Sequence, residues 1–287
     1  MHLDAESHPM IGVVLAGDRT KNDSLINHTK AGCKALIEID GIPMVRRVVN
    51  ALQQSKAVAK IVLAGPEADE VAMDKPLSEL VASNEIAWRA PEASPSASAF
   101  HTMQSLEPDI PVLLTTADHP LLTREIVDAF SRQSLADDVD VTVGLAPHAL
   151  ITEAYPGIKK TVFRFSDGDF CGCNLFAFLT PEGRQAASFW RKIEQQRKKP
   201  LVLIGLLGWW TVFRYRMGML SLEEALGKLG KRLGLRVRAV ILPYANAAID
   251  VDSIADLALV NGLLADHRGL TFPVNSESAP GTVGPAR

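Results

Sequence analysis

The sequence lacks several features that would place it in other classes of protein. Its 287 residues contain only three cysteines (Cys33, Cys171 and Cys173), too few and too unevenly spaced for a disulfide framework. The longest apolar run, residues 201–213, is too short to cross a bilayer. The first ten residues lack the basic and then apolar order of a signal peptide. We therefore expect a cytoplasmic globular protein.

The sequence also lacks a strong excess of charge of either sign. Thirty Lys and Arg residues against 33 Asp and Glu residues give a net charge of −3, so we expect no nucleic-acid partner, and any anion-binding site must be local. The length allows either one large α/β domain or two small ones, each with a real core.

Strand-like and helix-like segments alternate along the chain. The apolar patterns predict strands at 11–15, 60–64, 85–89, 110–115, 139–144, 161–165, 173–178, 236–242 and 248–251, and helices at 43–55, 76–83, 98–106, 123–133, 221–234 and 253–264. Uninterrupted apolar strands that alternate with amphipathic helices indicate an α/β protein with a mostly parallel central sheet and helices on both faces.

Two polar loops should meet at one edge of this sheet. Ligands bind beyond the carboxyl ends of parallel strands, which places the loop 17–23 and the pair Ala117-Asp118 on the same rim. The first loop matches neither GxGxxG nor GxxxxGK[ST], so neither of those phosphate-binding mechanisms applies. It has one glycine, Gly17, which is followed by Asp18, and an acidic side chain at this position would be unfavourable beside a bound phosphate.

The residue types alone leave several roles open. Lys34 is either a solvated loop lysine or a clamp for phosphoryl oxygens. Asp118 is either part of an Asp-His-Pro turn or a metal ligand. Asp252 and Asp256 could equally cap the helix that follows them.

Read in order, the segments VVLAGDR, CKALIEIDGIPMVRRVVNAL, KIVLAG, VLLTTADHPLLT and DVDSIADL resemble the nucleotidyltransferase family of molybdenum-cofactor guanylyltransferase, cytidylyltransferases and sugar-nucleotide pyrophosphorylases. The resemblance covers roughly residues 11–145 and 245–264. It implies a GT-A-like, Rossmann-like three-layer sandwich. One nucleotidyltransferase domain would span 8–268, with a smaller α+β acceptor region at 145–245 and a disordered tail at 269–287.

The resemblance also implies a reaction. An NMP would pass from an NTP, either CTP or GTP, to a phosphorylated acceptor, small or lipid-linked, with Mg²⁺ as cofactor and pyrophosphate as the leaving group. Lys34 and Arg19 would be catalytic and hold the triphosphate, and Asn174 is a candidate for contact with the acceptor. The residues Leu15, Ala16, Gly17, Asp18 and Ser98 would bind the nucleotide. Mg²⁺ would be ligated by Asp118 and Asp250, with Asp252 as the alternate.

One departure from the family pattern concerns Asp18, which replaces a glycine usual in relatives. Its side chain must point away from the phosphates, toward the base, ribose or metal, or else it marks a site that no longer catalyses. We expect the first. Two other functions stay open: a GT-A-type glycosyltransferase, which would use an Asp-x-Asp metal motif where this chain has Thr116-Ala117-Asp118, and a non-catalytic nucleotide-binding regulatory module.

Residues 191–218 do not fit the simple family pattern, because basic residues flank an apolar run that contains Trp209 and Trp210. One interpretation is a buried helix or a dimer face. The other is a peripheral contact of residues 199–216 with anionic lipid at the inner face of a membrane. The sequence leaves the oligomeric state open.

Overall fold

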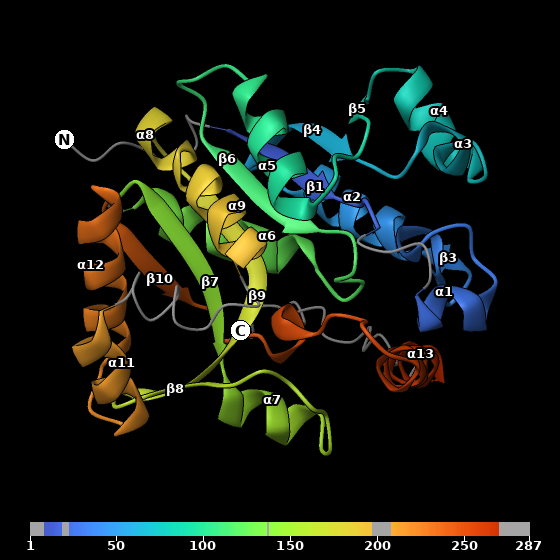
Figure 1. The fold of residues 1–287 in the computed structure, drawn as a ribbon. Helices are drawn as coiled ribbons and strands as arrows, with labels where there is room; N and C mark the ends of the chain where they lie inside the picture. The colour runs from blue at the N-terminus through green and yellow to red at the C-terminus, as the bar shows by residue number, and fades with distance from the viewer. Residues whose placement is uncertain (1–8, 19–22, 137, 197–207, 270–287) are drawn as a thin grey trace, which may run out of the picture.

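A single large sheet runs through the middle of the protein, with helices on both faces (Figure 1). The structure is a computed structural model and describes residues 9–18, 23–136, 138–196 and 208–269. In spatial order the strands are β10 (Val237–Ile241), β7 (Val141–Pro147), β9 (Gly168–Phe178), β6 (Val112–Thr116), β1 (Met10–Leu15), β4 (Val58–Ala64) and β5 (Ile86–Arg89), and β8 (Phe163–Phe165) pairs with β9. A separate hairpin consists of β2 (Glu38–Ile39) and β3 (Ile42–Pro43).

The sheet is mostly parallel, as the sequence predicts. Strands β6, β1, β4 and β5 run parallel to one another, as do β7 and β10, whereas β9 lies antiparallel between β6 and β7. The predicted strand 173–178 is therefore longer than expected and begins at Gly168. Its buried residues alternate with partly exposed ones, so that Cys171, Cys173 and Leu175 point into the core and the opposite face of β9 stays open.

Each face of the sheet has its own hydrophobic core. On one face, α2 (Met44–Gln54) and α6 (Arg124–Leu135) contribute Val48, Leu52 and Phe130. On the other face, α5 (Pro95–Gln104) and α9 (Ala186–Gln196) lie side by side, and Met103 and Ala187 pack there (Figure 1). This arrangement is the three-layer sandwich expected from the alternating pattern.

The remaining helices are short or lie at the edges of the molecule. They are α1 (Ser24–Thr29), α3 (Ala68–Val71), α4 (Lys75–Ala82), α7 (His148–Ala154), α8 (Pro181–Arg184), α11 (Trp209–Arg216), α12 (Leu222–Leu233) and α13 (Ile254–Gly269), with 3₁₀ turns η1 (Lys34–Leu36) and η2 (Ala245–Ala248).

The prediction of a strand at 248–251 is wrong. This segment continues from the η2 turn as an extended loop, and the backbone N–H of Val251 donates to the carbonyl of Asp118 at 3.0 Å. The apolar side chains of Ala248, Ile249 and Val251 are buried, which explains the strand-like sequence pattern. The loop therefore delivers its acidic residues to the end of β6 instead of extending the sheet.

Asp140 connects three elements at one edge of the sheet. Its carboxylate accepts hydrogen bonds from the backbone N–H of Arg236 at 2.7 Å, from the Arg236 guanidinium and from the Thr180 hydroxyl. Hydrogen bonds from Arg236 lower the pKa of Asp140. We expect Asp140→Asn to lower the free energy of unfolding at pH 7 by about 2 kcal/mol, since hydrogen bonds to a charged group are lost.

The same carboxylate gives this prediction a pH dependence. The pKa of Asp140 is lower in the folded than in the unfolded state. The ionised carboxylate therefore adds to the free energy of unfolding above the ordinary Asp pKa of about 3.9, and this stabilisation is lost as the pH falls below that value. In urea unfolding, the difference between wild type and Asp140→Asn should shrink between about pH 5 and pH 3. Asp138→Asn is the matched control, because the exposed Asp138 also contacts Arg236. An equal effect of both variants would contradict the prediction.

Candidate active site

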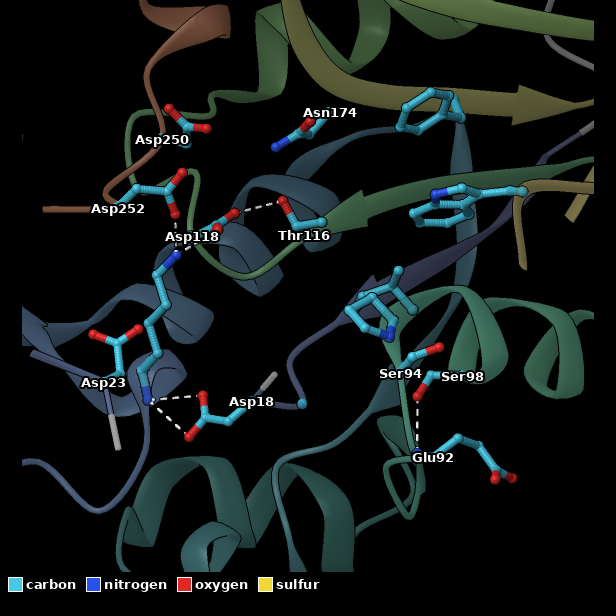
Figure 2. Close-up of a pocket in the computed structure, with 16 residues that line it drawn as sticks. Asp18, Asp23, Glu92, Ser94, Ser98, Thr116, Asp118, Asn174, Asp250 and Asp252 are labelled. Atoms are coloured by element: carbon cyan, nitrogen blue, oxygen red, sulfur yellow. Dashed lines mark hydrogen bonds and ion pairs between the residues drawn. The ribbon is translucent and has the colours of Figure 1, made fainter. Parts of the chain in front are cut away.

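A cavity of about 770 Å³ opens at the carboxyl ends of β1 and β6 (Figure 2). The residues predicted for the site are brought together there: Leu15, Gly17, Asp18, Lys34, Ser98, Asp118 and Asp250 all line it. Ala16 lies in a smaller hollow beside it, and Arg19 lies outside the described residues. The alternate metal ligand Asp252 and the acceptor candidate Asn174 also line the cavity.

The parallel pairing of β1 and β6 sets the position of the two predicted loops. Leu15 pairs with Thr116, and the N–H of Ala117 donates to the Leu15 carbonyl at 2.9 Å, so Gly17 and Asp118 follow at the same rim. Gly17 is closely packed: a side-chain Cβ there would come within 2.8 Å of Pro91. The glycine is thus required by the fit of this loop against the chain after β5.

The Lys34 ammonium lies between two carboxylates. Its Nζ is 2.8 Å from Oδ2 of Asp118 and 2.5 Å from Oδ1 of Asp252 (Figure 2). Burial acts against both charges, but the attraction between them prevails. It lowers the pKa of Asp118 to about 2, and the two carboxylates raise the pKa of Lys34. The Lys34 ammonium and the carboxylates of Asp118 and Asp252 thus form one cluster of contacting charged groups.

Asp250 has a different cationic partner. Its carboxylate pairs with the ammonium of Lys160, whose side chain is only 9% exposed. Burial lowers the pKa of Lys160, although neighbouring acids oppose this. The geometry therefore favours the alternate Asp252 over Asp250 as the carboxylate that shares a cation with Asp118. Sequence reasoning missed Lys160, because this residue lies in a loop between α7 and β8 with no motif around it.

Asp18 points toward the backbone that carries Lys34. Its Oδ1 and Oδ2 accept the Lys34 backbone N–H at 3.1 and 3.4 Å, at the start of η1 (Figure 2). Burial raises the pKa of Asp18. A glycine at this position could not make the contact, so Asp18 anchors the segment that presents the lysine. In this geometry the Asp18 carboxylate is engaged by the protein backbone rather than turned toward a phosphate.

This contact predicts different effects for two substitutions. Asp18→Ala removes the acceptor for the Lys34 N–H, whereas Asp18→Asn retains a carbonyl oxygen there. We expect the alanine variant to lose about tenfold in kcat/KM for the nucleotide, since a less firmly held Lys34 costs about 1.4 kcal/mol in the transition state. The asparagine variant should retain most of its activity. Equal losses in both variants would show instead that the charge of Asp18 matters.

Asp18 also belongs to a cluster with Cys33 and Glu70. Their potential ligand atoms lie within 4.8 Å of one another, the one such group of three among the described residues. Burial, together with the charge of Glu70, raises the pKa of Cys33 to about 12, so its thiol stays protonated.

The buried His119 contacts Asn174, which lines the cavity. The Asn174 amide nitrogen is 2.8 Å from Nε2 of His119. Burial lowers the pKa of His119 to about 4, so the imidazole is neutral at pH 7. Asn174 has a φ of 47°, in the left-handed region that costs energy for a residue other than glycine. This strain, in a residue that lines the cavity, supports Asn174 as a candidate for acceptor contact.

Ser98 has a hydrogen-bonding role within the loop that precedes it. Its Oγ accepts the backbone N–H of Glu92 at 2.9 Å, and Ser94 caps α5 by accepting the N–H of Ala97. Both hydroxyls thus shape the loop 91–98 beside Gly17.

Both tryptophans of the predicted lipid-contact segment are exposed. In α11, Trp209 is 72% exposed and Trp210 is 63% exposed, which rules out the buried-helix interpretation for this helix within one chain. Residues 199–207 lie outside the described residues. Across the described part of the chain, no helix is long and apolar enough to cross a membrane. The contact with anionic lipid stays a prediction, and flotation with anionic liposomes would test it.

The fold and the site together define a class: an α/β enzyme of GT-A-like architecture with a lysine and carboxylates at the carboxyl rim of its sheet. The family model of the MobA-like NTP transferase domain matches residues 12–163, more than half of the chain. The chain belongs to this family and is a nucleotidyltransferase, which confirms the resemblance noted in the sequence. No curated protein matches the chain.

Solved structures of similar fold also match the chain. A hypothetical transferase from Thermus thermophilus has a TM-score of 0.73 and 27% identity over 87% of this chain and 99% of its own. CMP:2-keto-3-deoxy-manno-octonic acid synthetase, complexed with CTP, has a TM-score of 0.52 and 16% identity over 91% of this chain and 100% of its own. A 2-C-methyl-D-erythritol 4-phosphate cytidylyltransferase, also from Thermus thermophilus, has a TM-score of 0.51 and 15% identity over 90% of this chain and 99% of its own. The last two share the fold.

Proposed function

We propose that this protein transfers a nucleotidyl group from CTP or GTP to a phosphorylated acceptor and releases pyrophosphate, with Mg²⁺ as its cofactor. The observation that carries this proposal is the Lys34 ammonium between Asp118 and Asp252, at a cavity of nucleotide size. A lysine beside paired carboxylates supplies both a partner for phosphates and hard oxygen ligands for a divalent cation.

The chemistry of the cavity fits a divalent cation. Among the described residues that line it, six are acids (Asp18, Asp23, Glu92, Asp118, Asp250 and Asp252) and Lys34 is the one cation. Such a lining would repel a bare triphosphate. Asp118 and Asp252 would hold the Mg²⁺, with Asp250 as the second choice because Lys160 already engages it. The ion would neutralise charge on the phosphates during transfer.

The protein's own residues would align and stabilise the reacting groups. An oxygen of the acceptor phosphate attacks the α-phosphorus, forms a new P–O bond and displaces pyrophosphate, which leaves with the electrons of the broken P–O bond. Lys34 would bind the phosphates and stabilise the charge that develops on them, as would Arg19 from the loop after Gly17.

This reaction needs no general base, because an acceptor phosphate is already ionised at neutral pH. The neutral and buried His119, whose Nε2 is engaged by Asn174, accordingly takes no proton in this mechanism. Asn174 and the open face of β9 would form the wall that contacts the acceptor, which is either a small molecule or lipid-linked.

A screen for pyrophosphate release tests the proposal. The purified protein is mixed with Mg²⁺, each of the four NTPs and a panel of phosphorylated sugars, polyols and lipids. CTP is placed first because two structural neighbours are named for CTP or cytidylyl transfer. We expect release that depends on NTP, acceptor and metal together. Nucleotide binding in thermal-shift assays without release from any pair would favour the non-catalytic module instead.

A further inference from the structure

Lys34 occupies the position between Asp118 and Asp252 that a divalent cation would take. Its Nζ is within 3 Å of a carboxylate oxygen of both Asp118 and Asp252, so one positive centre already bridges the two oxygens that would ligate the metal. We propose that Lys34 excludes divalent metal from this site until a triphosphate draws the ammonium away, so that the metal is bound tightly only together with the nucleotide. This inference rests on the proposed function, since it assigns the metal to the same carboxylates.

The distances leave no room for both cations on the same oxygens. A Mg²⁺ ion that bridged the same two carboxylate oxygens at its usual distance of about 2.0–2.1 Å would lie within about 4 Å of the Lys34 Nζ in its present position. Two positive charges that close repel each other strongly in a site of reduced dielectric constant. The metal must therefore displace the ammonium from at least one carboxylate.

Asp250, the third aspartate considered as a metal ligand, is not more accessible to a metal ion. Asp250 is paired with Lys160, so each of Asp118, Asp250 and Asp252 has an ammonium partner in this structure. The two lysines differ in freedom: the Lys160 side chain is 9% exposed and the Lys34 side chain 20% exposed. Lys34 also lines the large cavity. Lys34 is thus the partner that can be released.

A triphosphate gives the released ammonium a new partner. Because Lys34 faces the cavity, phosphate oxygens that enter there can replace the carboxylates around its Nζ. The metal then finds two free carboxylate oxygens and further ligands on the nucleotide. By thermodynamic linkage, the nucleotide must raise the affinity for metal by the same factor as the metal raises the affinity for nucleotide.

Binding of Mn²⁺, followed by electron paramagnetic resonance, tests this inference on the full chain. Without nucleotide we expect weak Mn²⁺ binding to wild type. Lys34→Gln should bind Mn²⁺ at least about tenfold more tightly, because the ammonium no longer competes with the metal for the two carboxylates. Lys34→Met, which matches the side chain in length, serves if the glutamine variant does not fold. Adding CTP or GTP should raise the Mn²⁺ affinity of wild type more than that of the variant.

Two further variants serve as controls. Lys75→Gln removes the same charge from the exposed Lys75–Glu79 pair on α4 and should leave the Mn²⁺ affinity unchanged. Adding Asp118→Asn to Lys34→Gln should abolish the gain, because the metal then lacks a ligand. An unchanged affinity in Lys34→Gln, or an equal gain in Lys75→Gln, would overturn the inference.

The proposed function is judged separately. If wild type releases pyrophosphate with Mg²⁺ while Lys34→Gln binds free Mn²⁺ no better than wild type, the function stands and the exclusion by Lys34 is wrong. If no protein binds Mn²⁺ even with CTP or GTP present, the metal-dependent function fails, and the inference fails with it.

Discussion

Asp118→Asn should reduce pyrophosphate release at least about 10³-fold while the protein remains folded, which corresponds to about 4 kcal/mol of lost transition-state stabilisation. Asp118 is the carboxylate at the end of β6 whose oxygen contacts Lys34, and its Oδ1 also accepts the Thr116 hydroxyl at 2.6 Å. Asparagine retains the shape but not the charge. The substitution would therefore weaken both the binding of the metal and the contact that positions the Lys34 ammonium. The measurement is kcat with saturating Mg²⁺ and NTP.

Two neighbouring aspartates supply the controls for this prediction. Asp252→Asn should cause a loss close to that of Asp118→Asn, because Asp252 shares the same ammonium. Asp250→Asn should cause a smaller loss, because Asp250 is paired with Lys160. A severe loss in Asp250→Asn with a mild loss in Asp252→Asn would restore the choice of metal ligand made from the sequence. Full activity in Asp118→Asn would contradict the proposed mechanism.

Lys34→Ala should lower kcat by about 10²–10³-fold, about 3–4 kcal/mol, because the ammonium that holds the phosphates is lost. The protein should stay folded, since the Lys34 backbone N–H still donates to Asp18 and the neighbouring Ala35 and Leu36 remain buried. Initial rates with the best NTP and acceptor, together with thermal unfolding, measure both effects.

Two lysine variants sharpen this result. Lys34→Arg keeps a positive charge but changes its geometry, so we expect partial activity. Lys75→Gln on the surface of α4 should leave kcat unchanged. If Lys34→Ala retained wild-type kcat, the lysine would be only a counter-ion of Asp118 and Asp252, and the catalytic role assigned to it would be wrong.

Local patterns were sufficient to place most of the individual strands and helices, but not to order them in the sheet. The apolar run that forms β1 and the amphipathic pattern of α2 lie within one or two residues of their predicted ends, because both depend on burial with a fixed period. The antiparallel course of β9 between β6 and β7 could not be predicted, since strand order depends on contacts between distant segments. The segment 248–251, which continues from the η2 turn, was mistaken for a strand because a buried irregular loop has the same apolar composition.

The candidate site was predictable in part. The family resemblance of the motifs pointed to Gly17, Lys34 and Asp118, all of which line the cavity. It did not distinguish Asp250 from Asp252, which lie two residues apart in the same motif. The structure separates them by their partners, Lys160 for the first and Lys34 for the second.

The sequence by itself determined the alternation of strands and helices, because apolar periodicity is a local property of the chain. Its ordered motifs also carried the family resemblance that implied a nucleotidyltransferase. Only the tertiary structure decided which charges meet. Lys34 is 84 residues from Asp118 and 218 residues from Asp252 along the chain. The strength of such contacts depends on ångström-scale distances and on burial, which arise only when the sheet places the loops at one rim. The role of Asp18 as an anchor for Lys34 was decided in the same way.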